Sequence, residues 1–146
     1  MAVSVLDSYV ESTERIQPDQ ANNDGNVHGG ETVRLMDELA ATAAMTVAGT
    51  TCVTAHIGSV DFQNPIPVGY VAKLSAYVYE TGTRSIGVRV TVESRNPRDS
   101  EVIPATSACF TMVAVNEDED ESDSVALPSV VPQTDRGEQL VKTVPC

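Results

Sequence analysis

A single amphipathic helix, expected over residues 31–48, constrains the fold of this chain more than any other feature. A pair of glycines precedes it, and good helix formers fill it. At 100° per residue its apolar side chains gather on one face, formed by Val33, Met36, Ala40, Ala43, Ala44 and Val47. The opposite face carries Glu31, Arg34, Glu38 and Thr42. The apolar face therefore needs a cover supplied by the rest of the chain.

The segments around this helix favour β-strands. An early strand is expected within residues 3–16, and β-branched or alternating residues predict four more over 51–63, 68–81, 84–95 and 103–116. Short turns at 64–69, 80–83 and 95–101 separate the later strands, which favours antiparallel pairing between neighbours. One helix with five strands predicts an α+β fold, in which a curved five-stranded antiparallel sheet covers the helix.

Length and charge suggest one domain with an acidic extension. The chain has 146 residues, the size of one ordinary domain. We expect that domain to occupy residues 1–117 and residues 118–146 to form a partly flexible acidic tail. An acid-rich block lies at 116–124, and a short terminal helix is expected after Thr134 as its N-cap. The net charge of -12 argues against nucleic acid as a partner.

Cellular location and metal chemistry are constrained by what the sequence lacks. It shows neither a signal-peptide pattern at its start nor an apolar run long enough to span a membrane, so we expect a cytoplasmic protein without a membrane partner. The three cysteines, Cys52, Cys109 and Cys146, have no CxxC spacing. We therefore expect no disulfide framework and no metal site, with Cys52 and Cys109 as buried, inert thiols. No cofactor is expected.

Two adjacent acids in the helix have different surroundings. With Val33 as the origin, Asp37 lies near the edge of the apolar face, whereas Glu38 lies on the polar face. Glu38 is expected to be a solvated surface acid. An ionised group at the position of Asp37 needs a partner or access to water. Asp37 is therefore either a carboxylate hydrogen-bonded at a sheet or subunit contact, or a general base or nucleophile at the edge of a cleft.

The glycine pair before the helix has a chemical interpretation. Gly29 and Gly30 allow close approach of a ligand, and the first N–H groups of a helix lack partners and lie at the positive end of its dipole. They are suited to a carbonyl oxygen that becomes negative. Asp37 lies about 10 Å further along the axis. The two features therefore belong to different sites unless a second chain joins them, which argues for a dimer with shared sites.

Several strings in one collinear order resemble the hotdog-fold acyl-CoA thioesterases, in particular the acyl-CoA hydrolase branch. They are QPDQANNDGNVHGGETVRLMDELAATAA, VTAHIGSVDFQNPIPVG and YETGTRSIGVRVTVES, which together cover about residues 14–95. The strand ATSACFTMVAV and the segment LPSVVPQT also look like the family. The resemblance implies a long helix wrapped by a curved sheet, chains paired edge to edge, and active sites at the dimer interface. It further implies a homodimer at least, with a trimer of dimers as the expected assembly.

The resemblance also implies roles for individual residues in the hydrolysis of acyl-CoA to free acid and CoA. Asp37 would be the catalytic carboxylate, Asn22 the asparagine of the loop, and the Gly30 N–H a donor to the thioester carbonyl. The turn formed by Gly82, Thr83, Arg84 and Ser85 would lie near the CoA pantetheine and phosphates, and Arg84 suits a phosphate by its charge. His28 and Gly29 are further candidates for substrate binding. Tyr70 replaces an acidic residue found in many relatives.

Other functions remain alternatives. A hotdog dehydratase or hydratase pairs its acid with a histidine, often five residues after an aspartate, where this chain has Thr42. A non-catalytic acyl-CoA sensor on the same fold usually carries a DNA-binding segment, which this acidic chain does not offer. A serine hydrolase is disfavoured because no G-x-S-x-G motif occurs. His56 is expected to pack or bond within a strand.

Overall fold

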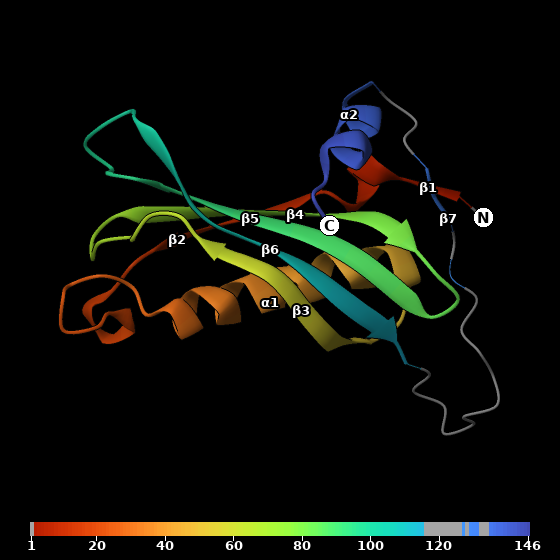
Figure 1. Cartoon of the computed structure of the whole chain (residues 1–146), viewed down its shortest axis with the longest axis horizontal. Helices are drawn as coiled ribbons and strands as arrows, with labels where there is room; N and C mark the ends of the chain where they lie inside the picture. The colour runs from red at the N-terminus through yellow and green to blue at the C-terminus, as the bar shows by residue number, and fades with distance from the viewer. Residues whose placement is uncertain (1, 116–126, 128, 132–134) are drawn as a thin grey trace.

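A long helix lies across the concave face of a curved antiparallel sheet. The computed structural model describes residues 2–115, 127, 129–131 and 135–146. The helix, α1, spans Gly29–Ala48 and ends at Gly49, whose φ of 69° is the left-handed conformation common after helix ends. The sheet has the order β2-β4-β5-β6-β3 (Figure 1), with strands β2 (Val10–Arg15), β3 (Cys52–Phe62), β4 (Val71–Thr81), β5 (Ser85–Arg95) and β6 (Val102–Ala114). This is the expected hotdog arrangement.

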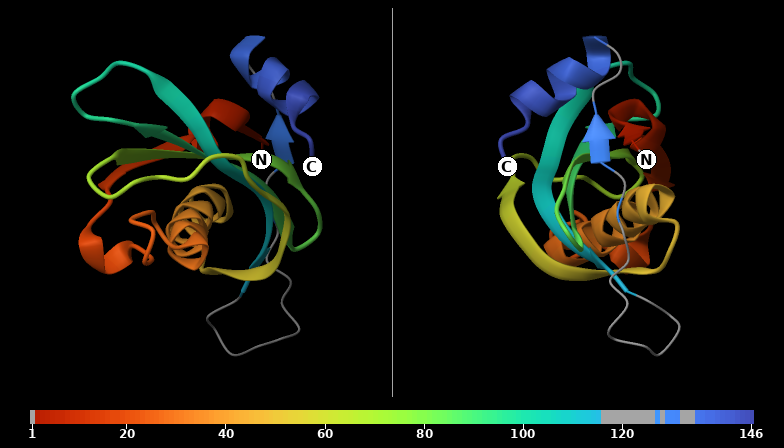
Figure 2. Two further views of the ribbon diagram at one scale, coloured as in Figure 1. Left: turned by 60° about the vertical axis from the view of Figure 1, so that its left-hand side comes forward. Right: turned by 90° about the vertical axis from the view of Figure 1, so that its right-hand side faces the viewer.

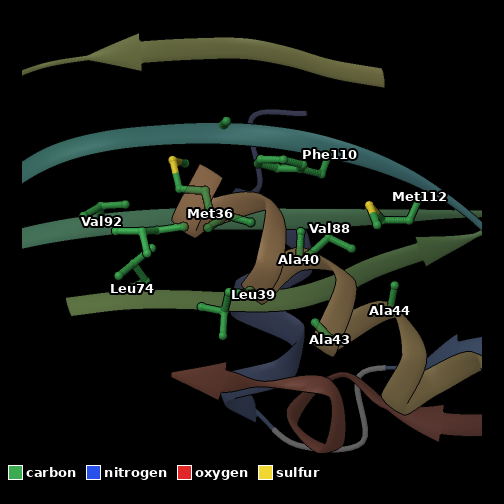
Figure 3. Packing of buried hydrophobic residues seen from close by; sticks show 14 of the residues in the cluster. Met36, Leu39, Ala40, Ala43, Ala44, Leu74, Val88, Val92, Phe110 and Met112 are labelled. Carbon is green, nitrogen blue, oxygen red and sulfur yellow. The ribbon is translucent and has the colours of Figure 1, made fainter. Parts of the chain in front are cut away.

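The core lies between α1 and the sheet (Figure 3). The helix buries Thr32, Leu35, Met36, Leu39, Ala40, Ala43, Ala44 and Val47. These side chains meet buried residues of the strands, among them Leu74, Val88, Val92, Phe110 and Met112. The apolar face predicted for the helix was too narrow. Leu35 and Leu39 are also buried, while Val33 is only half-buried. A sheet that curls around a helix covers a wider arc than a flat sheet, which accounts for the difference.

Irregularities in the ladder between β3 and β6 accompany the curvature. The register of this pair shifts between Thr54 and His56 and again between Gly58 and Asp61. Ser59, within the second irregularity, has a φ of 51°. Such bulges bend a strand and increase its twist. They carry β3 around the side of α1, as the end-on views show (Figure 2).

The expected pairing of β3 with the next strand along the chain is wrong. β3 pairs with β6, whereas β4 lies between β2 and β5. The connecting segment crosses the end of the sheet instead of forming a hairpin. It is held first by bonds from the N–H groups of Gln63 and Asn64 to Ala105 O, and later by one from Gly69 to Ile16 O. Its two prolines, Pro65 and Pro67, cannot donate ladder bonds, which disfavours a hairpin there.

The expected early strand is interrupted. β1 (Ala2–Ser4) pairs in parallel with β7 (Ser129–Val131) in a separate two-stranded sheet, and a 3-10 helix, η1 (Val5–Ser8), precedes β2. The Ser8 hydroxyl donates to Val5 O at 2.6 Å and accepts the N–H of Val78 at 2.9 Å. This side chain closes the turn and joins it to the sheet, which the alternation of apolar residues did not predict. A second 3-10 helix, η2 (Pro18–Gln20), lies in the loop before α1.

The short terminal helix is present as α2, Asp135–Thr143. It lies on the opposite side of the sheet from α1 (Figures 1 and 2). Cys109 forms a disulfide with Cys146, so the expectation that Cys109 is a free thiol and that no disulfide forms is wrong. Cys52 is a buried free thiol, as expected, and burial raises its pKa. The acidic block at 116–124 and Thr134 lie outside the described residues, as does most of the segment joining β6 to β7.

Candidate active site

The N-terminus of α1 has backbone donors that no other described residue of the chain pairs. Helix geometry leaves the N–H groups of its first residues, Gly29 and Gly30, without intrahelical acceptors. His28 is the N-cap, but its side chain makes no capping hydrogen bond. A Cβ atom at Gly30 would meet nothing within 4 Å, whereas one at Gly29 would lie 3.4 Å from the Phe62 ring. Packing within the chain therefore gives no reason for a glycine at position 30.

An ion-pair network engages the acid of the first turn, Glu31. The guanidinium of Arg34 donates to Glu31 at 2.7 Å and to Glu38 at 2.8 Å. Gln20 adds a hydrogen bond to Glu31 at 3.1 Å. The hydrogen bond from Arg34, followed by that from Gln20, lowers the pKa of Glu31. Glu38 is exposed, as expected.

The loop before α1 fixes the side chain of Asn22. Its Oδ1 accepts the backbone N–H groups of Asp24 at 3.0 Å and Asn26 at 3.2 Å. The loop is tied to the helix start because the N–H of His28 donates to Gln20 O at 2.9 Å. The carbonyl end of the Asn22 amide is thus occupied by its own loop, and the side chain is exposed. Its Nδ2 makes no hydrogen bond to another described residue, which leaves two donors available.

Asp37 has a specific partner on the edge strand. Its Oδ1 accepts a hydrogen bond from the hydroxyl of Thr54 on β3, a residue that also lies 3.5 Å from Met112 Sδ. Asp37 is half-buried, as its position at the rim of the apolar face predicts. Within the described part of the chain, its other carboxylate oxygen makes no hydrogen bond. The sheet contact that was one interpretation of Asp37 is therefore present, and one oxygen remains available for chemistry.

Thr54 is a partner of the candidate residue Asp37 that sequence reasoning missed. The rim position of Asp37 requires a polar partner, and the strand that follows the helix is a place to look for one. The register of β3 shifts directly after Thr54. Bulges of this kind often re-aim side chains near active sites. The sequence therefore indicated that Asp37 needs a hydrogen-bond donor. It did not indicate that the donor is Thr54, because the curvature of β3 that brings the two residues together was not predicted.

The turn between β4 and β5 lies at the other end of the helix. The N–H of Gly82 donates to Ser85 O at 2.8 Å, and the N–H of Ala114 donates to Arg84 O at 3.0 Å. A Cβ atom at Gly82 would lie 2.6 Å from the Ser85 hydroxyl, so a larger residue there would displace that side chain. Gly82 to Ser85 are all exposed. Ala114 pairs with Cys52 at the start of β3, whereas Gly29 lies against Phe62 at its end.

The candidate residues therefore form three groups in one chain. Asn22, His28, Gly29 and Gly30 lie at one end of α1, Asp37 lies two turns further along with Thr54, and the Gly82–Ser85 turn lies at the far end (Figure 1). A strand the length of β3, eleven residues, separates the two ends by about 30 Å. A single chain does not unite these groups.

An open pocket of about 380 Å³ lies beside the start of α1. Its lining is mainly apolar and includes Val27, Gly29 and Ile66. Phe62 forms one wall and is 58% exposed, a large exposure for an aromatic side chain. The pocket offers an apolar ligand a surface next to the backbone donors.

His56 and Tyr70, which the sequence also singled out, lie in the strand β3 and beside the core. His56 lies on β3 as expected, but its side chain is exposed and makes no hydrogen bond to another described residue. Tyr70 is half-buried against the core, and its carbonyl accepts the N–H of Ile16 at 2.9 Å.

In the described part of the chain, no three His, Cys, Asp or Glu side chains are grouped so that they could hold a metal ion. No helix there is long and apolar enough to cross a membrane.

Comparison with protein families gives a match over residues 24–101 to the thioesterase superfamily. Among curated proteins, the chain is 33% identical over 122 residues to the human cytosolic acyl coenzyme A thioester hydrolase. That match covers 82% of this chain but 31% of the human protein. A Bacillus subtilis acyl-CoA thioester hydrolase, itself uncharacterised, is 31% identical, with 94% of this chain and 78% of that protein covered. The chain thus spans about a third of the length of the human relative.

Solved structures agree with this match. A hexameric acyl-CoA thioesterase without ligand has a TM-score of 0.88 and 35% identity, covering 99% of this chain and 90% of that one. An acyl-CoA hydrolase from Staphylococcus aureus, bound to butyryl coenzyme A, coenzyme A and coenzyme A disulfide, has a TM-score of 0.88 and 30% identity. That match covers 99% of this chain and 87% of the other. Variants of the Staphylococcus enzyme with alanine replacing an aspartate, an asparagine and a threonine are similar to the same degree.

Proposed function

The chain belongs to the thioesterase superfamily, and from this we propose that it hydrolyses the thioester bond of acyl-CoA to a free acid and CoA. The observation that carries the proposal is the hydrogen bond between Thr54 and Asp37. It fixes a half-buried carboxylate beside the exposed edge of the sheet and leaves one of its oxygens available. A carboxylate held in this way suits a general base or a nucleophile.

Residue spacing supports the assignment of three residues. In the Staphylococcus aureus enzyme, the substituted asparagine, aspartate and threonine are separated along the chain by 15 and 17 residues. Asn22, Asp37 and Thr54 have the same two separations. Since the two chains share their fold over almost their whole length, we assign the three residues to one catalytic set.

In the proposed reaction, the thioester carbonyl lies at the N-terminus of α1. The Gly30 N–H polarises it and stabilises the negative charge that develops on its oxygen. Asp37 either removes a proton from the attacking water or attacks the carbonyl itself. Thr54 orients the carboxylate, and the amide of Asn22 donates to the water or to the carboxylate. Because a thiolate is a good leaving group, the reaction does not require a strong general acid.

A site of this kind needs two chains. Gly30 and Asp37 are about 10 Å apart along one helix. We propose that Asp37 and Thr54 of one protomer act on a thioester held by Gly30 and Asn22 of its partner. The CoA moiety would extend to the turn of Gly82, Thr83, Arg84 and Ser85, where Arg84 contacts a phosphate; His28 and Gly29 would line the path of the substrate.

The free edge of β3 supports such a pairing. β3 ends the five-stranded sheet, and its residues Val53 to His56 are exposed, with Val53 47% exposed. An uncovered edge with apolar side chains favours addition of another strand. We propose that two copies pair through β3 into one continuous sheet. The hexameric state of a similar enzyme favours a trimer of such dimers.

The test is release of free CoA thiol from a panel of acyl-CoA substrates, from acetyl to palmitoyl. Asp37→Asn should lower kcat by at least about a hundredfold, since the amide can neither accept a proton nor attack. Thr54→Val, which removes only the hydroxyl, should lower kcat by about ten- to a hundredfold, and Thr54→Ser should restore most of it.

Glu38→Gln is the matched control, because Glu38 is the neighbouring acid but lies on the exposed face. It should stay within about twofold of the wild type. Sedimentation and circular dichroism of each variant establish that fold and assembly are unchanged. Near-normal turnover by Asp37→Asn would remove Asp37 from the mechanism, and no thiol release by the wild type on any substrate would contradict the proposed activity.

A further inference from the structure

The Cys109–Cys146 disulfide joins the last residue of the chain to the outer face of the sheet. Cys109 lies on β6 and is buried, whereas Cys146, three residues after α2, is exposed. The two Cα atoms are 5.9 Å apart, and the bond closes a loop with a sequence separation of 37. Of the two cysteines, Cys146 is therefore the one on the solvent side.

In the described part of the chain, α2 packs on the sheet through a small apolar cluster. Its buried apolar side chain is Leu140, which packs with Val5 and Tyr77, and the Tyr77 hydroxyl donates to Leu140 O at 3.0 Å. Val141 adds partial packing. A nine-residue helix is shorter than the roughly 12–15 residues at which isolated helices become stable in water. The disulfide is thus an additional, covalent attachment of α2 to the sheet, beside this cluster.

A cation lies beside both sulfurs. Nη1 of Arg89 on β5 is 3.4 Å from Cys109 Sγ and 4.0 Å from Cys146 Sγ. Arg89 is half-buried and makes no ion pair with a described carboxylate. A guanidinium in this position stabilises a thiolate on Cys109. It therefore favours breaking of the disulfide with Cys109 as the leaving group.

We propose that the Cys109–Cys146 pair is a thiol-exchange site for low-molecular-weight thiols, and that its reduction releases α2 from the sheet. A thiolate RS⁻ attacks the sulfur of Cys146, the exposed residue of the pair, forming a mixed disulfide Cys146–S–S–R and leaving Cys109 as a thiolate beside Arg89. A second RS⁻ attacks the R sulfur of this mixed disulfide, giving RSSR and a thiolate on Cys146. Two thiols are oxidised and one protein disulfide is reduced. Release of α2 uncovers Val5 and Tyr77.

The first experiment measures the state of the thiols and of α2 in the 146-residue chain. After equilibration with excess oxidised glutathione, alkylation under denaturing conditions should label one cysteine, Cys52; labelling of all three would contradict the disulfide. Hydrogen exchange of the α2 amides should then become at least about tenfold faster when dithiothreitol is added. Unchanged exchange in protein whose thiols are all alkylatable would overturn the release of α2.

Two cysteine variants separate the link from general effects of the reductant. Cys146→Ser should show the fast exchange of α2 with or without dithiothreitol. Cys52→Ala, which alters the other cysteine but not the disulfide, should respond to dithiothreitol as the wild type does. Slow exchange in Cys146→Ser would show that the link is not needed to hold α2, contrary to the proposal.

A second experiment tests the role of Arg89 as a positioning residue. The rate constant for reduction by glutathione should fall by about tenfold in Arg89→Gln, because the leaving thiolate loses its cation, and Arg89→Lys should recover part of the rate. Arg98→Gln, on the exposed turn after β5, is the control and should be reduced at the wild-type rate. An unchanged rate in Arg89→Gln would remove Arg89 from the exchange reaction.

Discussion

The stability of α1 does not explain why residue 30 is a glycine. It lies in the first turn of α1, where most side chains favour the helix more than glycine does. Its backbone has no positive φ, and a Cβ atom would have free space. The space at Gly30 is accounted for if, in the proposed reaction, a substrate or a second chain occupies it.

Gly30→Ala is therefore expected to separate stability from activity. The substitution should raise the free energy of unfolding by about 0.4–1 kcal/mol, because it removes freedom from the unfolded chain without a clash in the folded one. It should lower kcat/KM, because the new methyl group lies where the thioester carbonyl approaches. Chemical denaturation and the thiol-release assay measure the two effects. A variant that gained stability and kept full activity would show that no ligand approaches Gly30.

Local sequence predicts where the helix and strands of this fold lie better than it predicts which strands pair. The helix predicted over residues 31–48 begins at Gly29, and the last strand predicted over 103–116 is β6, Val102–Ala114. Periodicity and β-branched residues act within each segment, so they predict its type. The neighbour of β3 depends instead on where the connection after Phe62 goes. That connection is held by Ala105 and Ile16, which are distant in sequence. The Thr54–Asp37 bond was missed for the same reason.

The exposed edge of β3 provides a test of assembly. Val53→Asp places a carboxylate on this edge, and in a symmetric pair the same charge appears on both chains. The dimer dissociation constant should rise by at least about tenfold, as measured by sedimentation equilibrium. Thr13→Asp puts the same charge on β2, the strand at the opposite edge, and should leave the dimer intact. Dissociation by both variants, or by neither, would show that β3 is not the contact.

The two sides of the sheet carry different elements. α1 and the candidate residues lie on the concave side and at the edge of the sheet, while η1, α2 and the disulfide lie on the outer side (Figures 1 and 2). The outer face was the least predictable part of the fold. The parallel contact of β1 with β7 and the Cys109–Cys146 bond join segments far apart in the chain, and an odd number of cysteines gives no pairing.

The separation of Gly30 and Asp37 along one helix has a genetic consequence. If each site takes Asn22 from one protomer and Asp37 from the other, two inactive variants complement each other. A dimer of one Asn22→Ala chain and one Asp37→Asn chain contains one fully wild-type site and one doubly defective site. Random pairing at equal amounts should restore about a quarter of the wild-type activity. Differently tagged chains, co-expressed and purified through both tags, isolate the mixed dimers, which should reach about half. Mixed dimers as inactive as either parent would mean that each chain builds its site alone.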